Sequence, residues 1–249
     1  MTEVRDRPVA APRLMDYGVH DPVRYKPSKE EALAQGRRGL SAISRWLPAR
    51  HDTPLLEVGC GAGNLLAALE EAGYSDVSGI DSEPDLIDHA RQVVGVKVSE
   101  GSWLSYFQNP GPSYGAVIAL DVIEHLTRET VEDTLRATRS RLRSDGRLIL
   151  RLPNARCPFV LPTFYGDLTH RLLMAPDLLQ HLLRNAGFTG EIVFAETRPH
   201  SLWKRVVFTI VHRVLVKPFI SMMYFHFYQQ FPGVLTRNIY CCAYASNIE

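Results

Sequence analysis

The sequence predicts an α/β fold in which a mostly parallel sheet of seven strands carries helices on both faces. Short apolar segments typical of strands alternate with longer segments of helical periodicity. A glycine-rich loop follows the first apolar strand segment, and no internal repeat occurs. With 249 residues, 45% hydrophobic and 22% charged, the chain is long enough for one α/β domain with additions.

Strands and helices are expected to alternate along the chain. The strand segments are short and aliphatic, and they lie at residues 55–58, 77–80, 96–99, 116–120, 147–152, 191–196 and 238–245. The helical segments lie at residues 29–47, 64–72, 84–94, 128–142 and 176–186. Pro84 suits the first turn of the third helix, and Gly187 suits the position just past the end of the last one. Strands separated by helices imply parallel neighbours covered on both faces.

One core with two additions is the expected domain organisation. Residues 1–48 form an N-terminal arm and a helix that covers the site, and residues 49–198 and 234–249 form the core. Residues 199–233 form a hydrophobic insertion before the last strand, dense in aromatic and aliphatic residues with Lys and Arg interspersed. Three interpretations of the insertion stay open: a lid over the acceptor, a homodimer contact, or an amphipathic helix on an anionic membrane surface.

Charge and cysteine content narrow the partners and the compartment. The net charge of +1 gives no overall field that favours nucleic acid, so nucleic acid is not an expected partner. None of Cys60, Cys157, Cys241 and Cys242 has a metal-ligand spacing, and all four are expected to be buried free thiols. No signal peptide or spanning segment is recognised. We expect a cytoplasmic protein, with peripheral contact at the inner membrane surface through residues 202–228 as the open alternative.

The loop at residues 57–63 is the strongest indication of a ligand. It reads Glu-Val-Gly-Cys-Gly-Ala-Gly and lies between a strand and a helix, where glycines let the backbone turn sharply and approach a ligand closely. A dinucleotide fingerprint would need a glycine at Asn64, and a phosphate-binding P-loop would need a Lys after the loop. The carboxylate of Glu57 favours a cationic ligand over a phosphate.

With its flanking strand, this loop resembles the E/D-x-G-x-G-x-G signature of class I S-adenosylmethionine-dependent methyltransferases. The resemblance covers residues 53–187 and implies a Rossmann-like fold with S-adenosylmethionine as cofactor and S-adenosylhomocysteine as product. It implies that Asp81, at the end of the second strand, binds the ribose hydroxyls and that residues 101–103 hold the adenine. Family members commonly carry Asp where Ser102 stands. The cofactor-binding residues implied are Glu57, Gly59, Cys60, Gly61, Gly63, Asp81, Ser82, Gly101, Ser102, Trp103, Leu120 and Asp121.

Residues 120–126 resemble the motif after the fourth strand in the subgroup that contains ubiquinone-biosynthesis O-methyltransferases. In those relatives, an acidic residue and a Glu-His pair resemble a divalent-metal site, matched here by Asp121, Glu124 and His125. The same Glu-His pair also occurs in relatives with no known metal, and we expect no metal in this protein.

Residues 164–171 resemble a segment of methyltransferases from glycan and natural-product pathways. The segment follows the fifth strand, on the side where acceptors enter. We expect His170 to take a proton from an acceptor hydroxyl and Asp167 to orient it or to bind the acceptor. The alternative is that Asp167 caps a turn and His170 only packs, since methyl transfer can also proceed by positioning alone.

The resulting hypothesis is an enzyme that transfers a methyl group to a small-molecule or lipid- or glycan-linked acceptor, at a hydroxyl oxygen. Methylation at nitrogen or carbon is the alternative within the same class. An NAD-dependent oxidoreductase is disfavoured by the missing third glycine of the fingerprint. A non-catalytic partner subunit that keeps the fold is the alternative outside enzymes.

Overall fold

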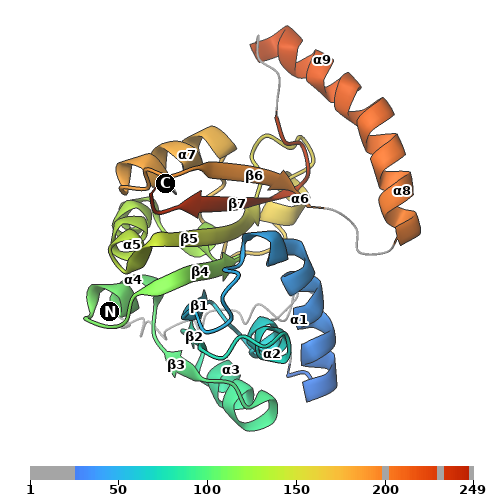
Figure 1. Cartoon of the computed structure of the whole chain (residues 1–249). Helices are drawn as coiled ribbons and strands as arrows, with labels where there is room; N and C mark the ends of the chain where they lie inside the picture. Colours follow the sequence, from blue (N-terminus) through green and yellow to red (C-terminus); the bar gives the residue numbers. More distant parts are fainter. Residues whose placement is uncertain (1–25, 198–201, 229–232, 247–249) are drawn as a thin grey trace, which may run out of the picture.

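The computed structural model describes residues 26–197, 202–228 and 233–246. Within these ranges the chain forms one seven-stranded sheet with helices on both faces (Figure 1). The predicted arm before residue 26 lies outside the described residues. The strands are β1 Leu55–Val58, β2 Val77–Asp81, β3 Val98–Glu100, β4 Tyr114–Leu120, β5 Leu142–Pro153, β6 Ile192–Glu196 and β7 Asn238–Tyr244. The helices are α1 Lys29–Ile43, α2 Asn64–Glu71, α3 Pro84–His89, α4 Trp103–Gln108, α5 Arg128–Ser140, α6 Leu161–Phe164, α7 Pro176–Asn185, α8 Leu202–Ile210 and α9 Lys217–Tyr228.

The strand order is β3-β2-β1-β4-β5-β7-β6, with β7 antiparallel to both of its neighbours and the other pairs parallel. This confirms the predicted mostly parallel sheet. The order reverses between β1 and β4, so the loops after these two strands diverge and leave a crevice at their carboxyl ends. The loop after β1 is the predicted glycine-rich loop.

Two apolar clusters fill the two sides of the sheet. One joins the sheet to α4, α5 and α7, and the other joins it to α1, α2 and α3. The central strands are mostly aliphatic because both of their faces are covered. Every residue of β1 is buried, including Glu57. The four cysteines are buried and free, as expected.

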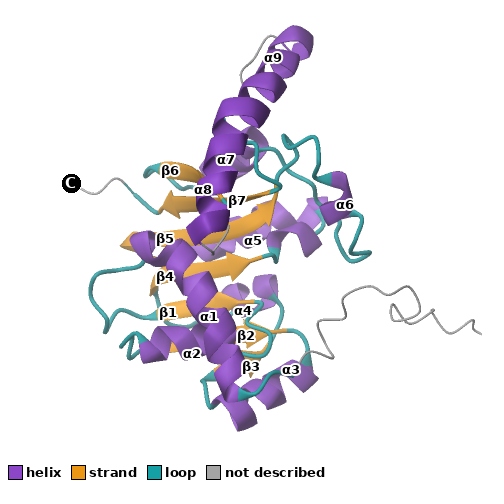
Figure 2. Cartoon of the chain, turned by 90° about the vertical axis from the view of Figure 1, so that its right-hand side faces the viewer, coloured by secondary structure: helices purple, strands orange, loops and turns teal. Residues whose placement is uncertain are grey.

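Helix α1 crosses α2 at the carboxyl side of the sheet (Figure 2). Ser28 and Glu31 form a capping box that starts α1. Gly36 allows the close crossing, because an added Cβ at this position would collide with the carbonyl oxygen of Asn64 at the start of α2. Arg37 of α1 donates two hydrogen bonds to Glu71 of α2, 2.6 and 2.5 Å long. The helix is thereby held over the glycine-rich loop.

The structure differs from the predicted elements in several places. Strand β5 begins at Leu142 rather than at residue 147, and the helix predicted over residues 128–142 ends at Ser140. The four-residue helix α6 was not predicted. Helix α4 was not predicted, because its six residues are too few for a clear periodicity. Strand β3 begins two residues later than expected, at Val98. The predicted insertion contains two helices, α8 and α9, joined by a π-helical segment at Val211–Val216. None of the helices in the described ranges is long and apolar enough to cross a membrane.

Candidate functional site

A cavity of 530 Å³ opens at the carboxyl ends of the parallel strands. Helix α1, the loop after β1, and the ends of β4 and β5 contribute to its lining. Of the residues that the sequence singled out, five line it: Glu57, Gly59, Cys60, Gly61 and Leu120. A cavity of this size lies in the usual range for a small-molecule or cofactor site.

The glycine-rich loop is held by backbone hydrogen bonds to β2. The N–H groups of Gly59 and Cys60 both donate to the carbonyl oxygen of Ile80, at 2.8 and 3.1 Å. Gly59 and Gly61 have φ angles of +66° and +51°, which side-chain-bearing residues rarely adopt. An added Cβ at Gly61 would meet no atom within 4 Å, so this glycine borders open space. Gly63 differs, because an added Cβ there would lie 2.8 Å from Cγ2 of Val96, so this glycine allows the start of α2 to approach the segment before β3 closely.

Glu57 places a buried carboxyl group beside this loop. Its side chain lines the cavity, and its Oε2 atom has no hydrogen-bond partner within the described residues. Burial and the negative charge of Asp81 raise the pKa of Glu57 well above its usual value, and the N–H of Leu66 offsets only part of this rise. A cationic group in the cavity would supply the missing partner and favour the ionised carboxylate.

Asp81 ends β2 and braces the loop. Its Oδ2 accepts a hydrogen bond of 2.7 Å from the N–H of Gly61, and its Oδ1 accepts one of 3.0 Å from the N–H of Glu83. Ribose binding, which the resemblance implies, and these two hydrogen bonds to the backbone therefore do not exclude each other. Each carboxylate oxygen has a further lone pair for a ligand hydroxyl. Ser82 is exposed beside it.

The residues after β3 have different surroundings. The N–H of Gly101 donates to the carbonyl oxygen of Asp81 at 2.8 Å, which keeps this turn next to the end of β2. The hydroxyl of Ser102 caps α4 and is exposed. The side chain of Trp103 is buried, and its indole N–H donates to Thr138 of α5 at 2.9 Å. Because this side chain belongs to the core, Trp103 has only its backbone to offer a ligand.

Asp121 follows β4 and is paired with a residue that the sequence interpretation missed. Arg151 of β5 lies next to Leu120 in the sheet register and donates from Nε to the Oδ1 atom of Asp121 at 2.8 Å, and from its terminal nitrogen to Oδ2. Asp121 has a φ of +57°. Arg151 lines the cavity, so it gives the opening a positive charge that the Asp121 carboxylate balances. The only signal in the sequence is an arginine within the aliphatic stretch of residues 148–152.

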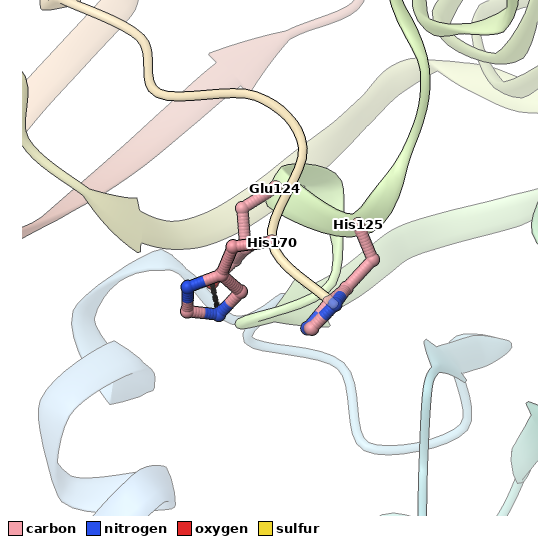
Figure 3. Close-up of side chains that lie close together, drawn as sticks. All are labelled: Glu124, His125 and His170. Carbon is pink, nitrogen blue, oxygen red and sulfur yellow. Dashed lines mark ion pairs between the residues drawn. The ribbon is translucent and has the colours of Figure 1, made fainter. Parts of the chain in front are cut away.

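A second group of polar side chains gathers where the turn after β4 meets the loop before α7. The backbone N–H groups of Arg171 and Leu172 both donate to the carbonyl oxygen of Glu124, at 2.8 and 2.9 Å. Figure 3 shows Glu124 and His170 side by side, with His125 next to them and both imidazoles projecting to the same side. The candidate ligand atoms of these three residues lie within 4.8 Å of one another.

Hydrogen bonds fix which nitrogen of each imidazole carries a proton. The Nδ1 atom of His170 lies 2.8 Å from the carbonyl oxygen of Phe164, which can only accept, so Nδ1 donates and Nε2 keeps its lone pair. The Thr169 hydroxyl donates its one proton to Asp167 at 2.6 Å, so the Nδ1 atom of His125, 2.9 Å from the same oxygen, also donates. In its neutral form, each imidazole therefore carries its lone pair on Nε2.

Acidic groups surround the Nε2 atom of His170. It lies 3.9 Å from Oε1 of Glu124 and 3.8 Å from Oδ2 of Asp167. Burial and the charge of Asp121 raise the pKa of Glu124 to about 8, so this carboxyl is neutral at pH 7. Partial burial opposes ionisation of Asp167, but hydrogen bonds from Thr169 hold its pKa below the usual value. Asp167 is therefore the charged partner and Glu124 the neutral one.

The cavity fits the cofactor that the sequence resemblance implies. S-adenosylmethionine carries an ammonium, a sulfonium and a ribose diol. The buried carboxyl of Glu57, whose Oε2 atom has no partner in the described residues, suits a cation, and the spare lone pairs of Asp81 suit hydroxyl groups. The open space beside Gly61 allows a ligand to approach the loop backbone.

The family model described as a methyltransferase domain matches residues 29–192 of the sequence. No curated protein sequence matches the chain. Many solved structures match the structure of this chain.

Three of these structures illustrate the shared fold. A SAM-dependent methyltransferase from Archaeoglobus fulgidus has a TM-score of 0.62 and 19% identity, over 84% of this chain and 94% of that chain. A possible histamine N-methyltransferase from Thermotoga maritima has a TM-score of 0.58 and 15% identity, over 87% and 94%. A magnesium protoporphyrin IX methyltransferase from Synechocystis PCC 6803, solved with bound SAH, has a TM-score of 0.52 and 20% identity, over 68% and 81%.

Proposed function

The chain belongs to the methyltransferase-domain family and is an S-adenosylmethionine-dependent methyltransferase, and from this premise we propose that it methylates a hydroxyl oxygen with His170 as the general base. The observation that carries the proposal is the fixed tautomer of His170. Its Nδ1 atom donates to the carbonyl oxygen of Phe164, which leaves the lone pair on Nε2. This Nε2 atom lies 3.8 Å from the ionised Asp167. A hydroxyl is the acceptor group that gains most from such a base, because its proton must leave as the oxygen forms its new bond.

The glycine-rich loop and the carboxylates around it are proposed to hold the cofactor. Glu57 would bind the ammonium group, and Asp81 would accept from the ribose hydroxyls while it braces Gly61. The residues after β3 would border the adenine through their backbone, and Leu120 and Asp121 would border the methyl donor from β4. When bound, S-adenosylmethionine supplies an electrophilic methyl group on a sulfonium.

His170 would act once the acceptor lies in the crevice. Its Nε2 atom would take the proton of the acceptor hydroxyl as the acceptor oxygen is methylated. The charge of Asp167, 3.8 Å from Nε2, stabilises the imidazolium that results. General-base catalysis of this kind contributes about 100- to 10,000-fold, and positioning of the two reactants contributes the rest.

No metal is part of this proposal. The resemblance of residues 120–126 placed Asp121 in a metal-binding set, but its carboxylate is already paired with the Arg151 guanidinium. A guanidinium paired with this carboxylate disfavours binding of a divalent cation to the same oxygens, because both groups are positively charged. The base function of His170 needs the Nε2 lone pair to be free.

The acceptor is proposed to be a small molecule or a lipid- or glycan-linked alcohol. The Thermotoga maritima and Synechocystis proteins are described as acting on very different acceptors, so the shared fold does not select one. The additions outside the core, residues 1–48 and 199–233, are proposed to shape the acceptor side around the core of residues 49–198 and 234–249.

The experiment uses S-adenosylmethionine labelled with carbon-13 in its methyl group. The purified protein is incubated with this donor and with protein-free small-molecule and lipid extracts of the source cells, in the presence of EDTA. The carbon-13 chemical shift of the product distinguishes a methyl group on oxygen from one on nitrogen or carbon. A methoxyl signal that needs the enzyme supports the proposal. An N-methyl or C-methyl product, or activity only after a divalent metal replaces EDTA, would overturn it. Calorimetric binding of S-adenosylhomocysteine without any labelled product would indicate a non-catalytic partner subunit.

A further inference from the structure

Helices α8 and α9 and the π-helical segment between them form a continuous helical arm, residues 202–228, that stands off the body (Figure 1). The arm is attached through α9. The hydroxyl of Tyr224 donates to the carbonyl oxygen of Arg156 at 2.6 Å, and the side chain of Ile220 is buried. Lys217 donates to the carbonyl oxygen of Gly233 at 3.0 Å and lies 3.7 Å from Glu196. The arm is therefore anchored through α9, and the described side chains of α8 are exposed to solvent.

The exposed surface of the arm is strongly apolar. Trp203 is 65% exposed, and its neighbours at helical spacing are also exposed: Val206, Val207, Ile210, Val211, Val214 and Leu215. Trp203, Val207 and Ile210 recur every three or four residues and share one face of α8. The exposed apolar side chains continue through the π-helical segment with Val211, Val214 and Leu215. A monomeric protein rarely exposes a contiguous apolar surface of this length without a partner.

The Lys and Arg residues in and around the arm have no acidic residues among them in the sequence. Between Glu196 and Glu249 the sequence contains no acidic residue. The same stretch contains six basic residues: Arg198, Lys204, Arg205, Arg213, Lys217 and Arg237. A chain with a net charge of +1 thus concentrates basic residues in the segment that contains the arm, and Arg213 is exposed on the arm itself. Apolar side chains that include Trp and Phe, together with Lys and Arg, are typical of helices that lie in the interface of an anionic bilayer.

We propose that the helical arm, residues 202–228, docks the protein on an anionic membrane surface. An arm-to-arm contact between two copies is disfavoured, because it would bring two segments without acidic residues together. A lid that covers the protein's own cavity would bury the apolar face, but this face is open to solvent along α8.

Docking in this way also bears on the acceptor. The arm lies on the side of the molecule to which the carboxyl ends of the parallel strands point, where the cavity opens (Figures 1 and 2). An arm lying in the bilayer interface would bring the cavity side close to the headgroups. If the proposed oxygen methylation holds, this placement favours a lipid-linked acceptor, and that step alone rests on the proposed function.

The test is flotation of the full-length protein with vesicles. One set contains phosphatidylcholine alone, and the other contains phosphatidylcholine mixed with the anionic lipid phosphatidylglycerol. We expect the protein to float with the anionic vesicles at low salt, to stay at the bottom with neutral vesicles, and to be released by high salt. The Arg213→Glu variant should lower the partition to anionic vesicles by roughly ten- to thirtyfold, since it removes one attractive charge and adds a repulsive one.

Two further variants separate the apolar contribution from a loss of fold. Trp203→Ser with Ile210→Ser should abolish flotation, whereas Leu178→Ser, at an exposed apolar residue of α7, should leave it unchanged. Each variant should bind S-adenosylhomocysteine like the wild type in calorimetry, which shows that the body is folded and the cofactor site intact. Wild-type protein that stays at the bottom with both vesicle types would overturn the docking proposal. Equal flotation with both vesicle types, or a dimer in light scattering that the double variant abolishes without any flotation, would also overturn it. Any of these results leaves the proposed oxygen methylation standing.

Discussion

The Nδ1 atom of His170 lies 2.8 Å from the carbonyl oxygen of Phe164, six residues earlier in the chain. The carbonyl accepts, so the imidazole is held with its proton on Nδ1 and its lone pair on Nε2. The loop that carries His170 is itself held by two backbone hydrogen bonds to the carbonyl of Glu124. A general base needs this kind of fixed orientation, and here the acceptors that set it are two backbone carbonyl oxygens, those of Phe164 and Glu124.

The first prediction concerns turnover. His170→Ala should lower kcat by about 100- to 10,000-fold and leave the affinity for S-adenosylhomocysteine unchanged, because the base acts on the acceptor and not on the cofactor. The His170→Asn variant can still donate to Phe164 but has no basic nitrogen, so it should be equally slow. Rates come from the labelled-methyl assay and affinities from calorimetry. Wild-type turnover in both variants would show that His170 only packs.

The second prediction concerns stability against pH. The pKa of Glu124 is raised from 4.5 to about 8 in the folded protein, so the folded state keeps a proton that the unfolded state releases between these values. The free energy of unfolding should therefore fall as the pH rises from 4.5 to about 8. Glu124→Gln should remove this part of the fall and be more stable than wild type near the upper limit, by on the order of a few kcal/mol.

Urea denaturation across this pH range measures the effect. Glu132→Gln, at a surface residue of α5 paired with Arg136, is the control and should follow the wild-type curve within about 0.5 kcal/mol. Parallel curves for the wild type and Glu124→Gln would mean that Glu124 is ionised in the folded protein.

The third prediction couples cofactor binding to proton release. Glu57 has a raised pKa in the free protein, and a bound ammonium group would lower it, so binding expels a proton. The affinity for S-adenosylhomocysteine should rise with pH between the lowered and the raised pKa and be constant outside this window. Calorimetry in two buffers of different ionisation enthalpy measures the released proton directly. Glu57→Gln should bind about 10- to 100-fold more weakly and release no proton. Proton release that persists in this variant would assign the effect to another group.

Local motifs made part of the site predictable from the sequence. The glycine-rich loop and Asp81 occupy the expected ends of β1 and β2, because a turn that must approach a ligand has few residue choices. Arg151 was not predicted, since its contact with Asp121 depends on the register in which β5 pairs with β4. The contribution of Gly36 to the cavity was equally hidden, because it depends on how α1 crosses α2.

Side-chain direction was the other feature that the sequence left open. Trp103 was predicted as a cofactor residue from its place after the third strand, but its indole lies in the core against Thr138. Residues 103–108 form a short helix, and its first residue turns inward rather than toward the cavity. The tautomer of His170 could not be predicted either, because the carbonyl oxygen of Phe164 contacts the imidazole only when the loop is folded.

The last prediction separates the structural from the ligand-facing glycines of the loop. An added Cβ at Gly59 would lie 2.5 Å from Cγ2 of Val122, and φ there is +66°. Gly59→Ala should therefore destabilise the fold by about 2 to 5 kcal/mol, from backbone strain together with overpacking.

Gly61 also has a positive φ, but a Cβ there would meet nothing within 4 Å. Gly61→Ala should cost only about 1 to 2 kcal/mol of stability. It should nevertheless lose most of its affinity for S-adenosylhomocysteine, because the methyl group enters the space through which a ligand reaches the loop. Urea denaturation gives the stabilities and calorimetry the affinities. If Gly61→Ala binds like the wild type, the ligand does not approach the loop from this side, and the assignment of the cofactor to this cavity falls.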